Sequence, residues 1–388
     1  MTSFFRKTFV FTSMLAAGMA AQAQQTGQIN VVTSAVPFLR ISPDARAGGM
    51  GDLGIATSPD ANSTFWNGAK TPFLKNRGGL AVTYTPWLKD IGVNDVFLAA
   101  MAGYYKLDEE SAITGSLRFF NLGDIQFTDF SGNPLSTGKP TELGIDVGYS
   151  RKLTDRWSVG ASLRYINSNL ARGFASNSGV VYQAGSTVAG DLSVFYDGTD
   201  EIGAGWRFGA AMTNLGGKIG YTNNAQERDY IPANLGLGAS YTMAFDETMS
   251  LMIGLDVNKL LVPTPPVATG DSAFDANALI SYRSKSVVSS WFSSFGDAPG
   301  GFGEEMRELQ MSLGAEFNYA DQFFVRGGYF YEDRTKGNRK FLSVGVGLKF
   351  NAMGLNFSYL VPSGTGTNRN PLSNTLRFSL NFDLGSFE

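Results

Sequence analysis

The chain has 388 residues, of which 13% are aromatic, 17% are charged and 47 are glycine, with a net charge of -3. That is less charge than an average soluble domain carries, and it gives no electrostatic reason to expect nucleic acid as a partner. Because Cys and His are both absent, disulfides, thiolate metal sites and Ser-His-Asp hydrolases are excluded. We therefore expect no catalytic residue, no metal site and no cofactor.

Residues 1–23 have the features of a secretory signal peptide. Arg6 and Lys7 form a short basic region, an uncharged apolar run extends from Thr8 to Ala20, and Ala21-Gln22-Ala23 offers a small-x-small cleavage site. The alternative is a transmembrane anchor, but a spanning helix needs about 20 apolar residues, which is more than this run provides. We expect the mature chain to begin near Gln24 and to contain no spanning helix.

Residues 24–76 contain Gly and Pro and lack sustained alternation of apolar and polar side chains. A segment on the periplasmic side, ahead of a barrel with a polar lumen, can fold inward as a plug. The alternative is a periplasmic tail. We favour an N-terminal plug segment at 24–76.

Residues 77–388 alternate between apolar and polar side chains in many segments. Leu376–Leu384 and Leu309–Tyr319 show the pattern most regularly. Successive strand side chains point to opposite faces, and segments of about 10 residues cross a membrane when tilted. A soluble sandwich also alternates, but here the polar face is rich in Gly, Ser and Asn. The sequence therefore predicts an all-β fold, a transmembrane antiparallel β-barrel of about 14 strands.

The predicted strands are joined by connections that alternate in length. We expect strands to begin near Gly78, Val93, Ser111, Pro140, Arg156, Gly185, Ala204, Pro232, Thr248, Glu308, Asp321, Lys340, Ala352 and Ser373. Longer loops are expected at 121–139, 168–184, 216–231, 259–307 and 362–372, with short turns between them. Because outer-membrane barrels place short turns in the periplasm, both barrel termini should lie there.

The polar faces of these strands carry charges of both signs. They are Asp146, Arg164, Arg207, Asp256, Glu316, Arg326, Arg377 and Asp383. Unpaired burial of such groups in the lumen is costly. We therefore expect them to pair with one another, with plug groups or with water, and to have no catalytic role.

Two motifs in the plug segment resemble those of a known family. Ala45–Gly51 (Ala-Arg-Ala-Gly-Gly-Met-Gly) and Asp60–Ala69, which includes Trp66-Asn67-Gly68-Ala69, resemble the N-terminal signature of FadL-like outer-membrane proteins. Val36–Asp44 and Tyr84–Leu88 are typical of the PorV (LptO) branch found in Bacteroidetes. The motif residues include Arg46, Met50, Gly51 and Asn67. The resemblance extends over the whole mature chain.

This resemblance implies a fourteen-stranded barrel with an N-terminal plug, located in the bacterial outer membrane and in contact with its lipid. It also implies a role in type IX secretion. PorV-like proteins bind the C-terminal signal domain of cargo proteins as these leave the translocon barrel (SprA/Sov). They deliver the cargo to the cell-surface complex whose sortase-like member, PorU, attaches it to lipopolysaccharide. These expectations come from the resemblance alone.

Gly48, Gly49 and Gly51 lack the strand, helix and Lys that would make them a phosphate loop. Glycine here more plausibly permits close packing or a positive φ, and we expect Arg46 to pair with a lumenal carboxylate.

The predicted loop 259–307 carries several aromatic residues, namely Trp291, Phe292, Phe295 and Phe302. Clustered exposed aromatics mark interaction surfaces. Our hypothesis is that they dock the translocon or the cargo signal domain. The alternative is that the loop folds over the barrel mouth and buries them.

The sequence leaves three functions of this chain to be tested. The first is a binding and shuttle protein of type IX secretion. The second is a FadL-like channel for hydrophobic molecules. The third is an enzyme acting on lipid A, for which no local motif supplies a mechanism once His is absent.

Overall fold

Fourteen antiparallel strands close into a barrel, as the alternation predicted. The computed structural model describes residues 29–88, 93–128, 131–174, 180–361 and 374–386. Each wall strand pairs with its neighbours along the chain, and β1 closes the sheet against β16. The wall strands are β1 (Asn76–Pro86), β2 (Val96–Lys106), β3 (Ser111–Leu122), β6 (Thr141–Lys152), β7 (Trp157–Asn169), β8 (Gly185–Asp197), β9 (Gly205–Gly216), β10 (Asn234–Ala244), β11 (Met249–Leu260), β12 (Gln310–Tyr319), β13 (Phe323–Tyr331), β14 (Lys340–Phe350), β15 (Met353–Val361) and β16 (Leu376–Ser386).

The alternation sorts apolar side chains to the outside of the wall. In β14, Leu342, Val344, Val346 and Leu348 are exposed, whereas Ser343 and the intervening glycines are buried on the lumenal side. The exposed side chains form an outer surface suited to lipid. Closure of the sheet leaves no open strand edge in the wall, which a membrane-spanning sheet requires.

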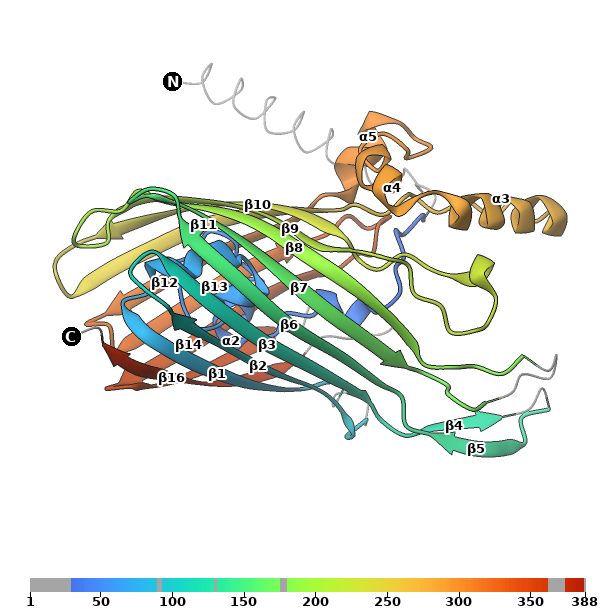
Figure 1. Ribbon diagram of the computed structural model, residues 1–388, viewed down its shortest axis with the longest axis horizontal. Coiled ribbons are helices and arrows are strands. Elements are labelled where there is room, and N and C mark those ends of the chain that lie inside the picture. The colour runs from blue at the N-terminus through green and yellow to red at the C-terminus, as the bar shows by residue number, and fades with distance from the viewer. Residues whose placement is uncertain (1–28, 89–92, 129–130, 175–179, 362–373, 387–388) are drawn as a thin grey trace, which may run out of the picture.

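The two ends of the barrel differ in their connections. Short turns join the strands at one end, including 107–110, 153–156 and 320–322, and both β1 and β16 meet that end. The opposite end carries the longer connections, with the helices α3 (Ser272–Ser284), α4 (Val287–Ser293) and α5 (Phe302–Glu305) (Figure 1). Because short turns are periplasmic in outer-membrane barrels, the helical end is the extracellular mouth.

Two of the predicted loops contain strands or α-helices that the sequence did not predict. The first holds a hairpin of β4 (Ile125–Thr128) and β5 (Pro134–Gly138). Both hairpin strands are largely exposed, so they show no two-faced pattern. The second is the connection 259–307, where α3 begins because the side chain of Asp271 accepts hydrogen bonds from the backbone of Ala273 and Phe274. Short 3₁₀ helices lie in two of the extracellular connections, η6 (Ala225–Glu227) and η7 (Met306–Glu308).

In the described ranges, no helix has the length and apolarity to cross a membrane.

The segment 29–75, called the plug segment below, lies inside the barrel (Figure 1). It contains η2 (Pro37–Arg40), α2 (Ala45–Gly48), η3 (Ser63–Phe65) and η4 (Gly68–Phe73). Phe38, Ala45, Met50 and Ala69 are all fully buried in it. The plug segment therefore packs as part of the protein core.

The plug segment begins at the extracellular mouth, and not on the periplasmic side as the sequence suggested. The backbone nitrogen of Asn30 donates to the carbonyl of Thr335 at 3.1 Å, and its side chain donates to the carbonyl of Pro265. Val32 packs with Tyr230, Leu260, Val262 and Tyr282. From there the segment passes down the lumen to the start of β1, so it spans the barrel.

Candidate functional site

Arg46 fixes the plug segment to the barrel wall. Its Nε and Nη2 donate to the two carboxylate oxygens of Glu316 on β12, at 2.9 and 2.7 Å. Its Nη1 donates to Asp60 at 3.0 Å and to the carbonyl of Ser58 at 2.9 Å. Glu316 also accepts from Arg326 on β13 at 2.6 Å. The two-point pairing of guanidinium with carboxylate sets both distance and orientation, so it holds α2 in one place against the wall.

The other charges predicted to face the lumen also have partners. Arg164 pairs with Asp146 and Asp191, Arg207 with Asp197, Arg326 with Glu316, Arg377 with Asp52, Asp383 with Lys349, and Asp256 accepts from the backbone of Gly54 and Ile55. Pairing within the wall and to the plug segment is confirmed. Buried charges without partners are costly, so these contacts specify one position of the plug segment.

Met50 and Gly51 make the closest approach between the plug segment and the wall. Gly51 has φ of 70°, a conformation that favours glycine, and its nitrogen donates to the hydroxyl of Ser343 at 2.8 Å. A Cβ added at Gly328 on β13 would overlap the backbone of Met50 and Gly51. Gly51 in the motif and Gly328 in the wall therefore both allow the plug segment and the wall to come this close.

Asn67 joins two turns of the plug segment to β8. Its side-chain oxygen accepts from the nitrogen of Ala69 at 3.1 Å, capping η4. Its amide nitrogen donates to the carbonyls of Ile55, at 3.1 Å, and of Val194 on β8, at 3.0 Å. Both polar atoms of the Asn67 side chain thus make hydrogen bonds that hold the plug segment together or attach it to the wall.

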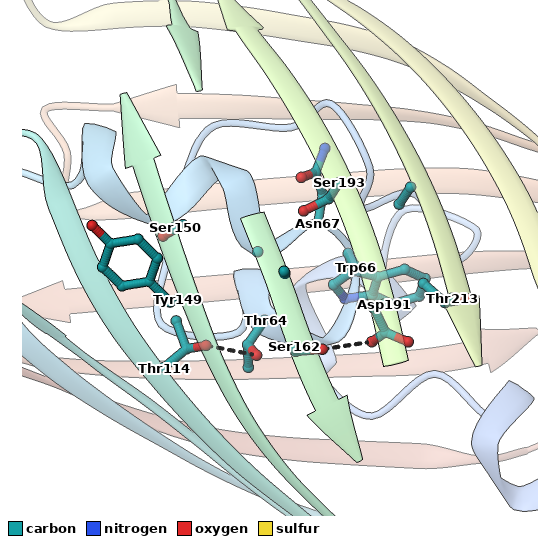
Figure 2. A pocket seen from close by; sticks show the side chains of 13 residues that line it. Thr64, Trp66, Asn67, Thr114, Tyr149, Ser150, Ser162, Asp191, Ser193 and Thr213 are labelled. Carbon is teal, nitrogen blue, oxygen red and sulfur yellow. Dashed lines mark hydrogen bonds between the residues drawn. The ribbon is translucent and has the colours of Figure 1, made fainter. Parts of the chain in front are cut away.

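A space of about 350 Å³, part of it open to solvent, lies between this part of the plug segment and strands β3, β6, β7, β8 and β9. Figure 2 shows Thr64 beside Thr114, and Ser162 hydrogen-bonded to Asp191 at 3.2 Å. Its lining is mainly small hydroxyl, amide and carboxylate side chains, together with Trp66 and Tyr149. Such a lining suits water better than a hydrocarbon.

The extracellular helices present aromatic side chains to solvent. Phe302 is 79% exposed, Phe292 is 73% exposed and Phe295 is 50% exposed, whereas Trp291 is partly buried. The burial alternative therefore fails for the three phenylalanines. We use the name aromatic patch for Phe292, Phe295 and Phe302, and its role in docking stays a prediction.

A network of buried charges fastens these helices to the barrel rim. Lys259 at the end of β11 contacts Glu305 at 2.9 Å and Glu308 at 2.7 Å. Lys336 from the β13–β14 loop contacts Glu308 at 2.9 Å and Glu304 at 2.5 Å. The chain from α5 into η7 is thus held from two sides, so Phe302 sits on a fixed support.

Three further groups, those of Asp297, Tyr230 and Lys218, make hydrogen bonds at the base of the helical insertion. Burial raises the pKa of Asp297, which accepts hydrogen bonds from the nitrogen and hydroxyl of Thr264. Burial also raises the pKa of Tyr230 to about 12, so its hydroxyl stays protonated and donates to the carbonyls of Tyr282 and Lys285. Lys218 donates to the carbonyls of Arg283 and Lys285 at the end of α3. Sequence reasoning missed these residues because they come from connections that lie far apart in the chain.

Comparison with known proteins places this geometry in context. The family described as type IX secretion system protein PorV matches residues 22–267. No curated protein sequence matches the chain. The fold is similar to that of the toluene transporter TbuX of Ralstonia pickettii, with a TM-score of 0.52, 13% identity, and coverage of 89% of this chain and 98% of that chain.

A second solved structure, the monoaromatic hydrocarbon channel CymD, is similar with a TM-score of 0.51, 14% identity, and coverage of 89% of this chain and 98% of that chain. At such low identity these likenesses show the fold and not the ligand. The closed wall with its apolar outer face locates the protein in the bacterial outer membrane, as predicted.

Proposed function

The chain belongs to the family of the type IX secretion system protein PorV, and on that premise we propose that it is a binding and shuttle protein rather than a channel. The partners are those that the family resemblance implies. They are cargo proteins with a C-terminal signal domain, the translocon barrel (SprA/Sov-like) that releases them, and the sortase-like attachment complex (PorU-like) that receives them.

One observation carries the proposal: large apolar side chains are exposed outside the mouth, whereas ion pairs cross the lumen between the plug segment and the wall. Phe292 and Phe302 are among the most exposed large apolar side chains of the described chain, and the helix that carries Phe302 is tied to the rim through Lys259 and Lys336. Exposed apolar patches of this kind mark protein-interaction surfaces. A conduit through the lumen would have to displace the ion pairs of Arg46.

The second candidate function is a FadL-like channel for hydrophobic molecules. Its support is the similarity of the fold to barrels described as toluene and hydrocarbon transporters. Uptake of radiolabelled toluene into cells, compared with and without the protein, tests it directly. We infer that the chain is not an enzyme acting on lipid A: without His and Cys such an enzyme would need a Ser-Lys or carboxylate-based mechanism, for which the sequence carries no local motif.

The test of the shuttle proposal is co-purification from detergent-solubilised membranes. We expect the wild-type chain to retain translocon and secreted proteins, and the double variant Phe292→Ser with Phe302→Ser to lose them. The matched control is Leu135→Ser, which removes an exposed apolar side chain from the hairpin β4–β5 at the same end of the barrel. Equal recovery with the double variant, in a normally assembled barrel, would remove the proposal.

A further inference from the structure

A second space lies in the lumen above the plug segment, on the side of the extracellular mouth. It encloses about 790 Å³, part of which is open to solvent. Its floor includes Leu39, Arg40 and Ile41 of the plug segment. Its walls come from the extracellular ends of the strands, for example Asn214 on β9 and Asn258 on β11. The space is therefore reached from outside the cell and closed toward the periplasm by the plug segment.

Three arginines line this vestibule, namely Arg40, Arg118 and Arg339, whereas its lining holds one carboxylate, that of Asp52, which lies 3.8 Å from Arg377. Arg40 and Arg339 share one partner, Glu332, which accepts from Arg40 at 3.4 Å and from Arg339 at 2.8 and 2.9 Å. Gln310 also donates to Glu332, at 3.0 Å. One carboxylate shared by two guanidinium groups leaves a positive charge on this side of the vestibule.

The third arginine, Arg118 on β3, is buried with only 3% of its surface exposed. Its Nη1 donates to the carbonyl of Leu39 at 2.8 Å, and its guanidinium lies 4.7 Å from the centre of the Phe65 ring. Within the described chain its Nε has no hydrogen-bond partner and it forms no ion pair. The carboxylates of Asp146, Asp191 and Asp44 act on it only from beyond contact distance. A buried guanidinium without a directly bound carboxylate is costly, and an anion entering the vestibule would offset that cost.

We propose that this vestibule binds a carboxylate group attached to a small apolar or aromatic body. A guanidinium presents its donors in a planar fork that matches a carboxylate. Phe65, Trp66 and Phe330 supply apolar surface beside it, and the side chains of Asn214, Asn234, Asn258 and Gln310 supply amide groups. So many polar groups would disfavour a plain hydrocarbon.

The carboxylate has three possible sources: a free small acid, a fatty acid, or the C-terminal carboxylate of a polypeptide. The last source rests on the proposed function, because a cargo protein recognised through its C-terminal domain brings that group to the mouth. The binding site itself does not rest on it.

The test is calorimetric titration of the purified full-length mature chain in an uncharged detergent. The probes are acetate, octanoate, N-acetylphenylalanine and the amide of N-acetylphenylalanine. We expect at least one acid to bind, and the amide to bind about 10-fold or more weakly than its acid, because a charge-assisted hydrogen bond is lost. Preference for octanoate identifies a fatty acid, and preference for N-acetylphenylalanine identifies a chain terminus.

The variants locate the site. Arg118→Gln should weaken binding of the acid about 10-fold or more, and Arg172→Gln, at an exposed position in an extracellular loop, should leave it unchanged. If Arg118→Gln fails to fold, as judged by its mobility in unheated gels, Arg339→Gln serves in its place. Equal binding of acid and amide, no binding of any acid, or binding that neither substitution weakens would overturn the proposal. Cargo co-purification that survives Arg118→Gln would exclude only the chain terminus as the source.

Discussion

Replacing Arg46 by Met should loosen the plug segment by an amount that can be worked out from its contacts. Met keeps the aliphatic volume but removes five hydrogen bonds, which reach Glu316, Asp60 and Ser58. Removing one partner of a buried ion pair costs about 3–5 kcal/mol. Glu316 keeps Arg326, and the side chain of Asp60 is 21% exposed, so we expect the lower end. A loss of about 3 kcal/mol raises the open fraction of the plug segment roughly 150-fold.

The chain contains no Cys, so a single introduced thiol can report the opening of the plug segment with no other cysteine in the chain to be labelled. Ser42→Cys is nearly isosteric and lies buried in the plug segment. The rate at which a maleimide labels it should rise roughly 150-fold when Arg46→Met is added, provided that reclosing is fast relative to labelling. The matched control is Arg40→Met, since Arg40 is partly exposed and its partner Glu332 keeps Arg339. That change should cost at most about 1 kcal/mol, or about fivefold in rate. Labelling of the Arg46→Met chain within fivefold of its parent would refute the reasoning.

Three further predictions concern the rim, the wall and the direction of the plug segment. Lys336→Met should make the helical insertion sensitive to added protease, because Glu304 loses its lysine partner and Glu308 keeps only Lys259; unchanged digestion would contradict this. Gly328→Ala should reduce the amount of folded barrel seen in unheated gels, whereas Gly327→Ala, where an added Cβ meets nothing within 4 Å, should not. A cysteine that replaces Ile29, which is 75% exposed, should react with a membrane-impermeant maleimide in intact cells, because the plug segment begins at the extracellular mouth. A cysteine that replaces Leu153, in a periplasmic turn, should react only after the cells are permeabilised.

The strands of the barrel wall could be predicted from sequence because the alternation of apolar and polar side chains that specifies them lies within each strand. In Leu376–Leu384 the polarity of each side chain alone indicates whether it lies on the outer or the lumenal face of the sheet. All fourteen strands begin within three residues of the predicted positions, and the charges on the polar faces found partners as expected. Arg46 was expected to face a lumenal carboxylate, but its partner Glu316 lies 270 residues away, and no spacing in the chain could have named it.

The extracellular structure could not be predicted in the same way. The helix α3 is largely exposed, so its residues carry no strong apolar period. The position of the plug segment depends on Val32 meeting Tyr230, Leu260 and Val262, which come from the β9–β10 connection, the end of β11 and the connection after it. The vestibule arginines likewise come from a plug helix, a wall strand and a loop, so each alone looks like an ordinary surface charge.

The central claim is that this barrel works by presenting the aromatic patch to secreted proteins at its extracellular mouth. The most direct measurement is photo-cross-linking in living cells from a photoreactive residue at position 302, with a residue at position 153 in a periplasmic turn as control. The account predicts capture of the translocon or of secreted proteins carrying a C-terminal signal domain from position 302 only. Capture of the same proteins from both positions, or of neither class from position 302 while the barrel is assembled, would contradict it.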